Sequence, residues 1–321
     1  MTVMEIGAAT KYPWLASARQ QITAATRRDR LPHALLIHCA SGLGDESLAL
    51  WIAAFVLCES PAERPCGHCA SCRLIAAGNH PDLSWVARAE DSKQLQIDQI
   101  RAICDVLAFK SYRGGYKAAV VTTADLMNAN AANALLKTLE EPPPQSLLIL
   151  CSARPSRLPA TIVSRCQRLT IAAPSRAAAL NWLRAQDAEV AWNDLLEFAS
   201  GAPLRAIELR STAFDELHRD MTQSVAQLAR GALDIPGAAE RWARDALATR
   251  LEWIETWITN SIREAVLNSA GLQSSGGIRK IRGLYGVLDR ARGMRLELAS
   301  SLNAQLAAEE LLLRAEAALA A

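Results

Sequence analysis

A glycine-containing loop between an apolar strand and a helix constrains the fold of this chain more than any other feature. Residues 34–39 predict a buried strand, residues 45–57 predict a helix, and the junction over residues 39–46 reads CASGLGDE. This is the outline of a phosphate-binding loop, G-x-x-x-x-G-K-[ST], which joins a strand to a helix. Such a unit is typical of a parallel sheet covered by helices, so we expect an α/β domain.

The same loop lacks the side chains that bind nucleotide. Gly42 and Gly44 are present, but Asp45 stands where a lysine would reach the β- and γ-phosphates, and Glu46 replaces the hydroxyl that would hold Mg²⁺. At roughly 4 Å and an effective dielectric constant of about 20, one charge pair is worth about 4 kcal/mol, so aspartate replaces attraction with comparable repulsion. We therefore predict a degenerate loop that binds no nucleotide.

A second element of nucleotide hydrolysis is also missing from the sequence. A P-loop ATPase needs acidic groups at the end of the strand beside the loop, for Mg²⁺ and for the attacking water. Here the predicted strand over residues 118–121 is followed by Thr122 and Thr123, which carry no charge. Asp125 comes later, where we expect it to cap a helix. We therefore expect no ATPase activity from this chain alone.

Strand and helix patterns alternate in the first half of the chain, and only helical patterns follow. Besides the loop unit, the first half predicts strands over residues 81–86, 118–122 and 146–151, and helices over residues 14–30, 97–109 and 129–140. Beyond residue 174 we predict short helices over residues 176–186, 192–200 and from 204. Long helices follow. One of them carries an apolar stripe at residues 251, 254, 258, 262 and 266, and another spans residues 301–320. A glycine- and serine-rich loop over residues 271–277 interrupts them.

These patterns predict three domains. Residues 1–168 form a P-loop-type parallel-sheet domain that contains an inserted cysteine module at about 58–72. Residues 169–211 form a small helical lid domain, and residues 212–321 form an all-helical C-terminal domain. The fold class is therefore α/β, followed by all-α.

Composition restricts the setting in which the chain works. It has 321 residues, 50% of them apolar, which is ample for packed cores, and its formal net charge of +2 gives no broad basic field. The N-terminal residues lack a basic region followed by an apolar run, and no stretch reaches about 18 uncharged apolar residues. We expect a soluble, cytoplasmic protein without a membrane partner.

Four of the eight cysteines are crowded into one short segment. Cys58, Cys66, Cys69 and Cys72 have the spacing C-x7-C-x2-C-x2-C. Four soft thiolates suit tetrahedral Zn²⁺ with no open position, so the pattern predicts a structural zinc site. Two other interpretations stay open: four thiols without a metal, and an iron–sulfur site, although the downstream cysteine and proline of the ferredoxin pattern are absent.

Other residues near or outside the quartet are assigned less specific roles. His68 and His80 lie close enough in sequence to replace a ligand, although four cysteines make this unnecessary. Cys39, Cys104 and Cys151 sit in apolar strand or helix patterns and are predicted to be small core residues.

Several motifs in the first two-thirds of the chain resemble one known family. They are LPHALL from Leu31, HPDL from His80, IDQIR from Ile97, NALLKTLEEPP from Asn133, and SRC at residues 164–166. These motifs resemble the clamp-loader branch of the AAA+ superfamily. With the cysteine quartet inserted after the loop helix, the chain is similar to the delta-prime family of bacterial DNA polymerase III subunits. The resemblance covers roughly residues 11–210, and beyond it only length and helical character agree.

The resemblance implies a role for one arginine. In that family the arginine of the SRC motif reaches the γ-phosphate of ATP bound by a neighbouring motor subunit, so Arg165 would be an arginine finger that acts in trans, with no catalytic residue in cis. A permanently charged, forked donor suits this role, and such fingers are worth about 10³ to 10⁵ in rate. From residue chemistry alone, an intramolecular ion pair with Glu140 or Glu141 stays open.

A second arginine matches a motif without the same expectation. Arg205 lies in the sequence GAPLR, which resembles the family's sensor motif, where an arginine faces the nucleotide of its own subunit. Because the loop of this chain is degenerate, we do not expect sensing, and a helix-capping or surface charge is the preferred interpretation.

The resemblance also implies partners. The chain would be a non-hydrolysing subunit of a DNA polymerase III holoenzyme, a nucleotidyltransferase, and would sit in a hetero-pentamer with gamma/tau-type motor subunits and a delta subunit. This clamp loader places the sliding clamp on primed DNA in replication. The C-terminal domain would form part of the oligomer collar, where helices bury apolar stripes against other subunits.

Two functions from other classes remain as alternatives. One is an active P-loop ATPase with an atypical site, which would bind ATP by itself. The other is a zinc-bearing DNA-binding protein that acts alone, with phosphate contacts from Arg27, Arg28, Arg30 and Arg64. Solvated surface charge is the simpler interpretation of these four arginines.

Overall fold

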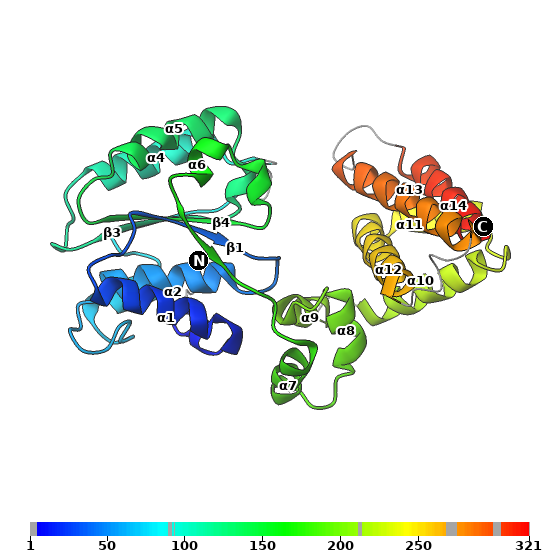
Figure 1. The fold of residues 1–321 in the computed structure, drawn as a ribbon, viewed down its shortest axis with the longest axis horizontal. Coiled ribbons are helices and arrows are strands. Elements are labelled where there is room, and N and C mark those ends of the chain that lie inside the picture. Colours follow the sequence, from blue (N-terminus) through cyan, green and yellow to red (C-terminus); the bar gives the residue numbers. More distant parts are fainter. Residues whose placement is uncertain are drawn as a thin grey trace. The chain divides into compact units, whose positions relative to one another are not determined.

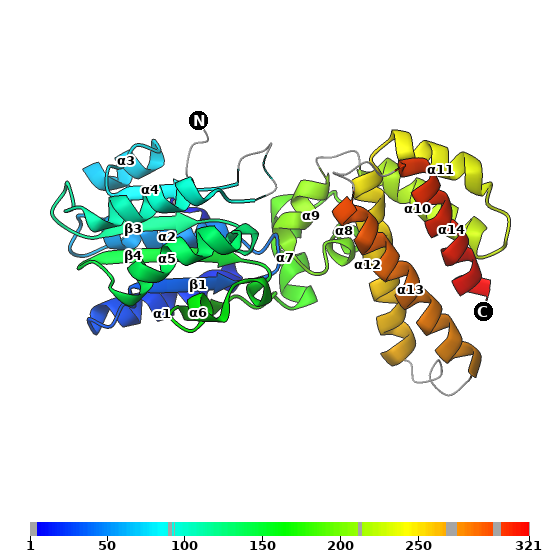
Figure 2. The ribbon, with the colours of Figure 1, turned by 90° about the horizontal axis from the view of Figure 1, so that it is seen from above.

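Figures 1 and 2 show the fold of the chain in a computed structural model. The structure describes residues 5–88, 92, 94–210, 214–267, 275–297 and 303–320. The chain divides into two compact units, one of Met1–Gln186 with Gly201–Arg205, the other of Asp187–Ser200 with Ala206–Ala321. The finer division into three domains at residues 168 and 211 stays a prediction.

The first unit is built on a five-stranded sheet in which all neighbouring strands are parallel. The strand order is β2-β3-β4-β1-β5. The strands are Ala34–His38 (β1), Leu83–Val86 (β2), Lys117–Val121 (β3), Ser146–Ser152 (β4) and Gln167–Thr170 (β5). The predicted P-loop-type parallel sheet is thus confirmed. The sequence pattern missed β5 because only Leu169 among its residues is buried, so no apolar run marks this strand.

Helices cover both faces of this sheet (Figure 1). α1 and α2 pack on one face, and α4, α5 and α6 pack on the other. The helices of this unit are Ala16–Arg27 (α1), Asp45–Leu57 (α2), Ala70–Ala76 (α3), Ile97–Ala108 (α4), Ala129–Glu140 (α5), Ala160–Val163 (α6) and Arg176–Gln186 (α7). Helical turns of the 3-10 type are Ala8–Thr10, Pro13–Leu15, Ala124–Leu126 and Pro155–Arg157.

Alternate residues of the strands enter two separate hydrophobic cores. On β1, Leu35 and Ile37 belong to the core beneath α1 and α2, whereas Ala34 and Leu36 belong to the core beneath α4 and α5. This follows from the two-residue period of a strand, whose side chains point alternately to opposite faces. Because both faces are covered, the central strands are apolar along almost their whole length.

Local chemistry sets the helix ends, and it corrects two predictions. α1 is shorter than the predicted helix over residues 14–30: a 3-10 turn begins at Pro13, and Asp29 adopts a φ of 52°, which ends the helix. Asp125 does not cap a helix as predicted, because it lies inside a 3-10 turn. Asn128 caps α5 instead, and its Oδ1 accepts the N–H of Ala131 at 2.8 Å.

The second unit is helical throughout its described residues, as predicted. Its helices are Trp192–Phe198 (α8), Phe214–Leu228 (α10), Ile235–Arg244 (α11), Leu247–Leu267 (α12), Ser275–Glu297 (α13) and Ala304–Ala320 (α14). Pro203–Arg210 (α9) begins in the first unit and ends in the second. None of the helices in the described part of the chain is both long and apolar enough to cross a membrane.

The structure modifies two predictions for these helices. The predicted apolar stripe of α12 is buried at Leu251, Ile254, Ile258 and Ile262, whereas Val266 is 45% exposed. The predicted glycine- and serine-rich loop is partly wrong, because α13 already begins at Ser275, within an uninterrupted helical segment. Residues 271–274 of that predicted loop, and residues 301–302 of the predicted last helix, lie outside the described residues.

Candidate functional site

The glycine loop that precedes α2 is held by the chain itself. Gly42 and Gly44 have φ angles of 81° and 87°, in the left-handed region that favours glycine. The carbonyl of Leu43 accepts the indole N–H of Trp14 at 2.8 Å, and the carbonyl of Gly42 accepts the N–H of Leu204 at 3.2 Å. Both contacts tie the loop to segments that are distant in sequence.

The first turn of α9 fills the space directly above Gly42. A Cβ atom on this glycine would lie 2.5 Å from the Cβ of Arg205 and 2.7 Å from its backbone nitrogen. Carbon atoms attract one another best at about 3.5–4.0 Å, so no side chain fits here. Gly42 is therefore needed for a close approach between two parts of the chain as well as for the turn. The φ angles of both glycines suit the strand-to-helix turn.

Acidic groups dominate the electrostatics at the start of α2. Asp45 and Glu46 occupy the first turn, and burial raises the pKa of Asp45 while the charge of Asp125 adds to the shift. Burial also raises the pKa of the neighbouring thiol of Cys39, to about 12. A bound triphosphate would meet carboxylates here where nucleotide-binding loops supply a lysine.

β3 leads into the two threonines that the sequence indicated, but it is not the direct neighbour of β1, because β4 lies between them in the sheet. Thr122 is buried after β3, and Thr123 has a φ of 52°. Asp125 accepts a hydrogen bond from the hydroxyl of Ser152 on β4 at 3.1 Å. This contact ties the turn after β3 to the neighbouring strand, which gives Asp125 a structural partner.

Arg165 lies between α6 and β5 in a well-anchored segment. The next residue, Cys166, is buried in the core beneath α4 and α5, and burial raises its pKa to about 11. The guanidinium of Arg165 donates from Nη2 to Oε1 of Glu140 at 2.8 Å and from Nη1 to the carbonyl of Thr161 at 3.0 Å. The intramolecular ion pair that residue chemistry suggested is therefore present, with the Arg165 side chain 36% exposed.

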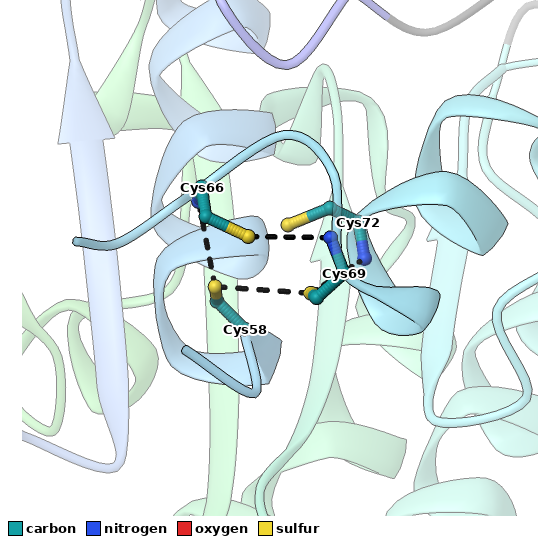
Figure 3. Close-up of side chains that lie close together, drawn as sticks. All are labelled: Cys58, Cys66, Cys69 and Cys72. Carbon is teal, nitrogen blue, oxygen red and sulfur yellow. Dashed lines mark hydrogen bonds between the residues drawn. The ribbon is translucent and has the colours of Figure 1, made fainter. Parts of the chain in front are cut away.

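Figure 3 shows the four predicted metal ligands together at the C-terminal end of α2. The sulfur atoms of Cys58, Cys66, Cys69 and Cys72 all lie within 4.8 Å of one another, and those of Cys58 and Cys69 are 3.9 Å apart. A tetrahedral site with Zn–S bonds of about 2.3 Å has sulfur–sulfur edges of about 3.8 Å. The quartet therefore has the composition and the spacing to hold a metal ion such as zinc.

Backbone N–H groups point at these sulfur atoms. Cys58 accepts from the N–H groups of Ser60 at 3.5 Å and Cys66 at 3.4 Å. Cys66 accepts from Cys69 at 3.3 Å, and Cys69 accepts from Cys72 at 3.4 Å at the start of α3. Hydrogen bonds of this kind favour the thiolate over the thiol, which is the form that binds a metal.

Burial and hydrogen bonding act in opposite directions on the thiol pKa values. Burial acts to raise the pKa of Cys69, but hydrogen bonds, chiefly from the backbone N–H of Cys72, outweigh it and lower the pKa to about 6. Burial raises the pKa of Cys58 and of Cys72. A central cation would favour the thiolate form of all four residues.

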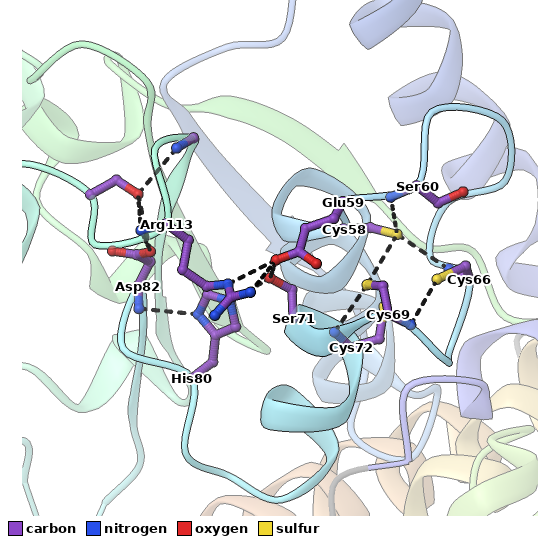
Figure 4. Close-up of polar contacts among 12 residues, drawn as sticks. Cys58, Glu59, Ser60, Cys66, Cys69, Ser71, Cys72, His80, Asp82 and Arg113 are labelled. Atoms are coloured by element: carbon purple, nitrogen blue, oxygen red, sulfur yellow. Dashed lines mark hydrogen bonds and ion pairs between the residues drawn. The ribbon is translucent and has the colours of Figure 1, made fainter.

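A polar network behind the quartet, shown in Figure 4, was not predicted. Glu59, next to Cys58, accepts hydrogen bonds from Ser71 at 3.1 Å and from Nε of Arg113 at 2.8 Å. The hydrogen bond from Arg113 lowers the pKa of Glu59. Ser71 in turn contacts Nε2 of His80 at 3.0 Å. This network connects α3 to the turn that precedes β3.

His80 and Asp82 complete the network on the side of β2. The N–H of Asp82 donates to Nδ1 of His80 at 3.1 Å, so a neutral imidazole carries its proton on Nε2 and donates it to Ser71. Burial lowers the pKa of His80, in keeping with the neutral ring. The carboxylate of Asp82 accepts the N–H groups of Tyr112 at 2.7 Å and Arg113 at 3.0 Å.

The structure gives His80 a different place from the one considered in the sequence. Its ring contacts Ser71 and Asp82, and it is not among the clustered metal-ligating groups. His68 is exposed and contacts the carbonyl of Cys66 at 2.8 Å. The motif HPDL at residue 80 was the only available signal for this network, because nothing in the spacing pairs Glu59 with Arg113.

The remaining candidate residues are dispersed. Arg27 and Arg28 border a groove of about 570 Å³ on α1 together with Arg19, whereas Arg64 donates from Nε to the carbonyl of Ser60 at 2.7 Å. Arg30 is exposed. Of the four arginines proposed for DNA contacts, Arg27 and Arg28 therefore line this groove, and Arg30 and Arg64 are not among its lining residues. Arg205 lies at the start of α9, against the glycine loop. Of the other cysteines, Cys39 and Cys151 are buried as predicted, and Cys104 is half-buried.

Comparison with known proteins identifies the family. A family model described as "DNA polymerase III, delta subunit" matches residues 15–175. The DNA polymerase III subunit delta' of Pseudomonas aeruginosa is 36% identical over 256 residues, which cover 78% of this chain and 77% of that protein. The subunit delta' of Escherichia coli is 38% identical over 204 residues, covering 62% of this chain and 60% of that protein.

A solved structure of a related type was also found. A DNA polymerase III gamma subunit-related protein from Thermotoga maritima is 19% identical, with a TM-score of 0.47, and the match covers 93% of this chain and 99% of that chain. The family model spans half of the chain, and the relative from Pseudomonas aeruginosa matches over more than two-thirds of both sequences. The chain therefore belongs to the delta-prime family of DNA polymerase III subunits.

Proposed function

We infer that this chain is the non-hydrolysing delta-prime member of a clamp loader. It would form a hetero-pentamer with gamma/tau-type motor subunits and a delta subunit in the cytoplasm. The complex would open the sliding clamp and place it on primed DNA during replication. Within this assembly the chain would bind no nucleotide in its own loop and would complete the ATP site of a neighbouring subunit.

The state of the glycine loop carries this proposal. Backbone atoms at the start of α9 approach Gly42 too closely for any side chain, and Asp45 and Glu46 stand in the first turn of α2. Shape and charge thus both oppose a triphosphate. A subunit with this loop contributes to ATP hydrolysis only through groups that it offers to another subunit.

Arg165 is the group that we assign to the neighbour. Its segment is anchored by the buried Cys166, while its own side chain is 36% exposed. An exposed ion pair such as the one with Glu140 is worth about 0–1 kcal/mol. An arginine finger worth 10³ to 10⁵ in rate corresponds to roughly 4–7 kcal/mol. The gain at a neighbouring γ-phosphate would therefore exceed the loss of the Glu140 contact.

We further propose that the cysteine quartet binds one structural zinc ion. Cys58, Cys66, Cys69 and Cys72 would supply all four ligands, which leaves no position for a substrate or water. When bound, zinc would cross-link the segment that contains Cys66, Cys69 and Cys72 to Cys58 at the end of α2, and it would supply no catalytic chemistry. The chain's own residues hold the thiolates by N–H donation, and Glu59 with Arg113 orients the segment against the sheet.

Replacement of one residue in the reconstituted complex tests the assignment of Arg165. In a complex that contains Arg165→Ala, the ATP site beside this chain should lose about 10³- to 10⁵-fold in hydrolysis rate. Because other motor sites keep their own arginines, total clamp- and DNA-stimulated ATPase activity should fall by the share of that one site. Single-turnover hydrolysis and clamp loading onto primed DNA measure the two effects.

Arg157→Ala is the matched control for this experiment. Arg157 is also exposed and lies in the same part of the first unit, in the 3-10 turn before α6. It should leave hydrolysis unchanged, and Arg165→Lys should restore little, because lysine lacks the planar fork. Wild-type ATPase activity and clamp loading with Arg165→Ala, in a complex of unchanged composition, would refute the finger assignment.

A further inference from the structure

The second unit contains a small pocket walled by aromatic rings. The pocket has a volume of about 250 Å³ and lies among α8, α10 and α12. Trp253 and Trp257 on α12 are stacked, with ring centroids 6.3 Å apart and an interplanar angle of 13°. Phe198 at the end of α8 and His218 on α10 lie 5.7 Å and 5.8 Å from the ring of Trp253. All of these residues belong to one compact unit.

One hydrogen bond fixes the orientation of the rings. The indole N–H of Trp253 donates to Nδ1 of His218 at 3.0 Å. In the neutral imidazole the proton is therefore on Nε2. Phe198 meets His218 edge-on, with an interplanar angle of 84°. Because these contacts link residues from three helices, the walls of the pocket are preformed.

The charge of the pocket is one-sided. Among the described residues that line it, Asp194, Glu197 and Glu264 carry carboxylates, and none is lysine or arginine. Asp194 and Glu264 are both exposed at the surface. Thr256 and Asn260 add neutral polar groups to the lining. These three carboxylates outnumber the nearby guanidinium of Arg263, which donates to Oδ1 of the lining residue Asn260 at 3.3 Å, so an anionic ligand is disfavoured.

Aromatic faces combined with carboxylates recognise one class of group. The face of a tryptophan ring attracts a cation through its quadrupole, and a carboxylate attracts the same cation directly. Trp257 is half-buried and offers such a face, whereas Trp253 is 2% exposed and supports Trp257 from behind. A guanidinium group fits better than an ammonium group, because it is planar, stacks on an aromatic face and donates in fixed directions to carboxylates. We propose that this pocket binds an arginine side chain presented by a partner protein. The proposal does not depend on the clamp-loader function or on Arg165.

Titration of the full-length chain with a small arginine probe tests the proposal. N-acetyl-L-arginine amide should shift the indole N–H signals of Trp253 and Trp257 in ¹H–¹⁵N spectra, in a saturable manner. N-acetyl-L-citrulline amide has nearly the same shape without the charge and should produce no saturable shift. N-acetyl-L-lysine amide should bind more weakly than the arginine probe. Citrulline binding as tight as arginine binding, or lysine binding as tight or tighter, would overturn the proposal.

Variants locate the binding to this pocket. Asp194→Asn combined with Glu264→Gln should weaken arginine binding about 2- to 25-fold, from about 1.5- to 5-fold for each exposed charge. Glu240→Gln on α11 removes a carboxylate outside the pocket and should leave the affinity unchanged. The amide spectrum of each variant reports whether the fold is kept. An unchanged affinity in the folded double variant would place the arginine elsewhere and refute the pocket.

Discussion

The two ends of α2 differ in how they relate to a ligand. The N-terminal end follows a loop whose sequence resembles a phosphate-binding loop, whereas the C-terminal end leads into four cysteines with the geometry of a metal site. At the N-terminal end, Asp45 and Glu46 occupy the first turn, where a helix attracts phosphate in nucleotide-binding loops. The chain thus places its own carboxylates at the positive end of the helix. At the C-terminal end, Cys58 leads into four clustered sulfur atoms.

The difference lies in whether the protein supplies its own counter-charge. At the loop end, Asp45 and Glu46 supply negative charge to the start of the helix, and the start of α9 packs against Gly42. The thiol end gathers groups that become anionic together and has only N–H donors to offset them. A similar position on one helix therefore carries carboxylates in one case and four clustered thiols, which suit a cation, in the other. Substitutions at each end of α2 test this contrast.

The largest effect is expected from Cys72→Ser at the thiol end. Cys72 is fully buried, and its replacement should remove stoichiometric zinc and lower the free energy of unfolding by several kcal/mol, since structural zinc binds zinc-finger peptides with about 10–16 kcal/mol. Elemental analysis and chemical denaturation measure both. Cys104→Ser, outside the quartet, should retain the metal. One zinc ion per chain in both variants would contradict the four-cysteine site.

At the loop end, Gly42→Ala should destabilise the first unit by roughly 2–5 kcal/mol. Left-handed backbone costs a non-glycine residue about 1–2 kcal/mol, and overpacking costs about 1–3 kcal/mol more. Gly114→Ala is a matched control, because Gly114 has a φ of 74° but open space around it. Denaturation midpoints of the two variants separate the costs. Equal destabilisation would show that the contact with Arg205 does not matter.

A smaller effect is expected from Glu59→Gln, which weakens the support behind the thiols. Loss of the charged acceptor for Arg113 should reduce zinc affinity about 10- to 100-fold, as for other groups that orient metal ligands. Competition with a chromophoric chelator measures this affinity. Glu63→Gln, an exposed neighbour, is the control. Equal zinc affinities in the two variants would show that the Glu59–Arg113 network does not support the metal site.

The smallest effect is expected from Asp45→Lys, which restores the missing charge of the loop. We expect no binding of a fluorescent ATP analogue, because the start of α9 still fills the space above Gly42. Stability should change by no more than about 1 kcal/mol, because the helix N-terminus favours the carboxylate of Asp45 whereas its burial, which raises its pKa, disfavours it. Asp98→Lys in the first turn of α4 is the control for this second effect. Micromolar, Mg²⁺-dependent binding would show that the charge at position 45, and not the packing of α9 against Gly42, decides whether the loop binds nucleotide.

The bounds of α2 and the cysteine cluster at its C-terminal end could be predicted because the residues that define them lie close together in the sequence. The bounds of α2, α5 and α7 agree with the prediction, since apolar periodicity and nearby helix-stopping residues define them. The four cysteines are close enough in sequence for their spacing to indicate a shared site. What was predicted correctly therefore depends on short separations along the chain.

The missed features depend on contacts between distant segments. Arg113 is far from Glu59 in sequence, and the approach of Arg205 to Gly42 joins α9 to a loop near the start of the chain. β5 escaped prediction because its neighbours cover only one of its residues. Asp125 looked like a helix cap, but Asn128 lies nearer to α5 and takes this role. No single-sequence pattern encodes these choices.

The contact between Gly42 and Arg205 has a consequence for how this loop varies during evolution. Because backbone atoms of α9 form the contact, exchange of the Arg205 side chain would not relieve it. Selection at position 42 therefore acts on volume and backbone conformation, and this holds whether or not the loop binds a ligand. Among relatives with the same packing, we expect glycine to persist at position 42 while the charges that follow it drift.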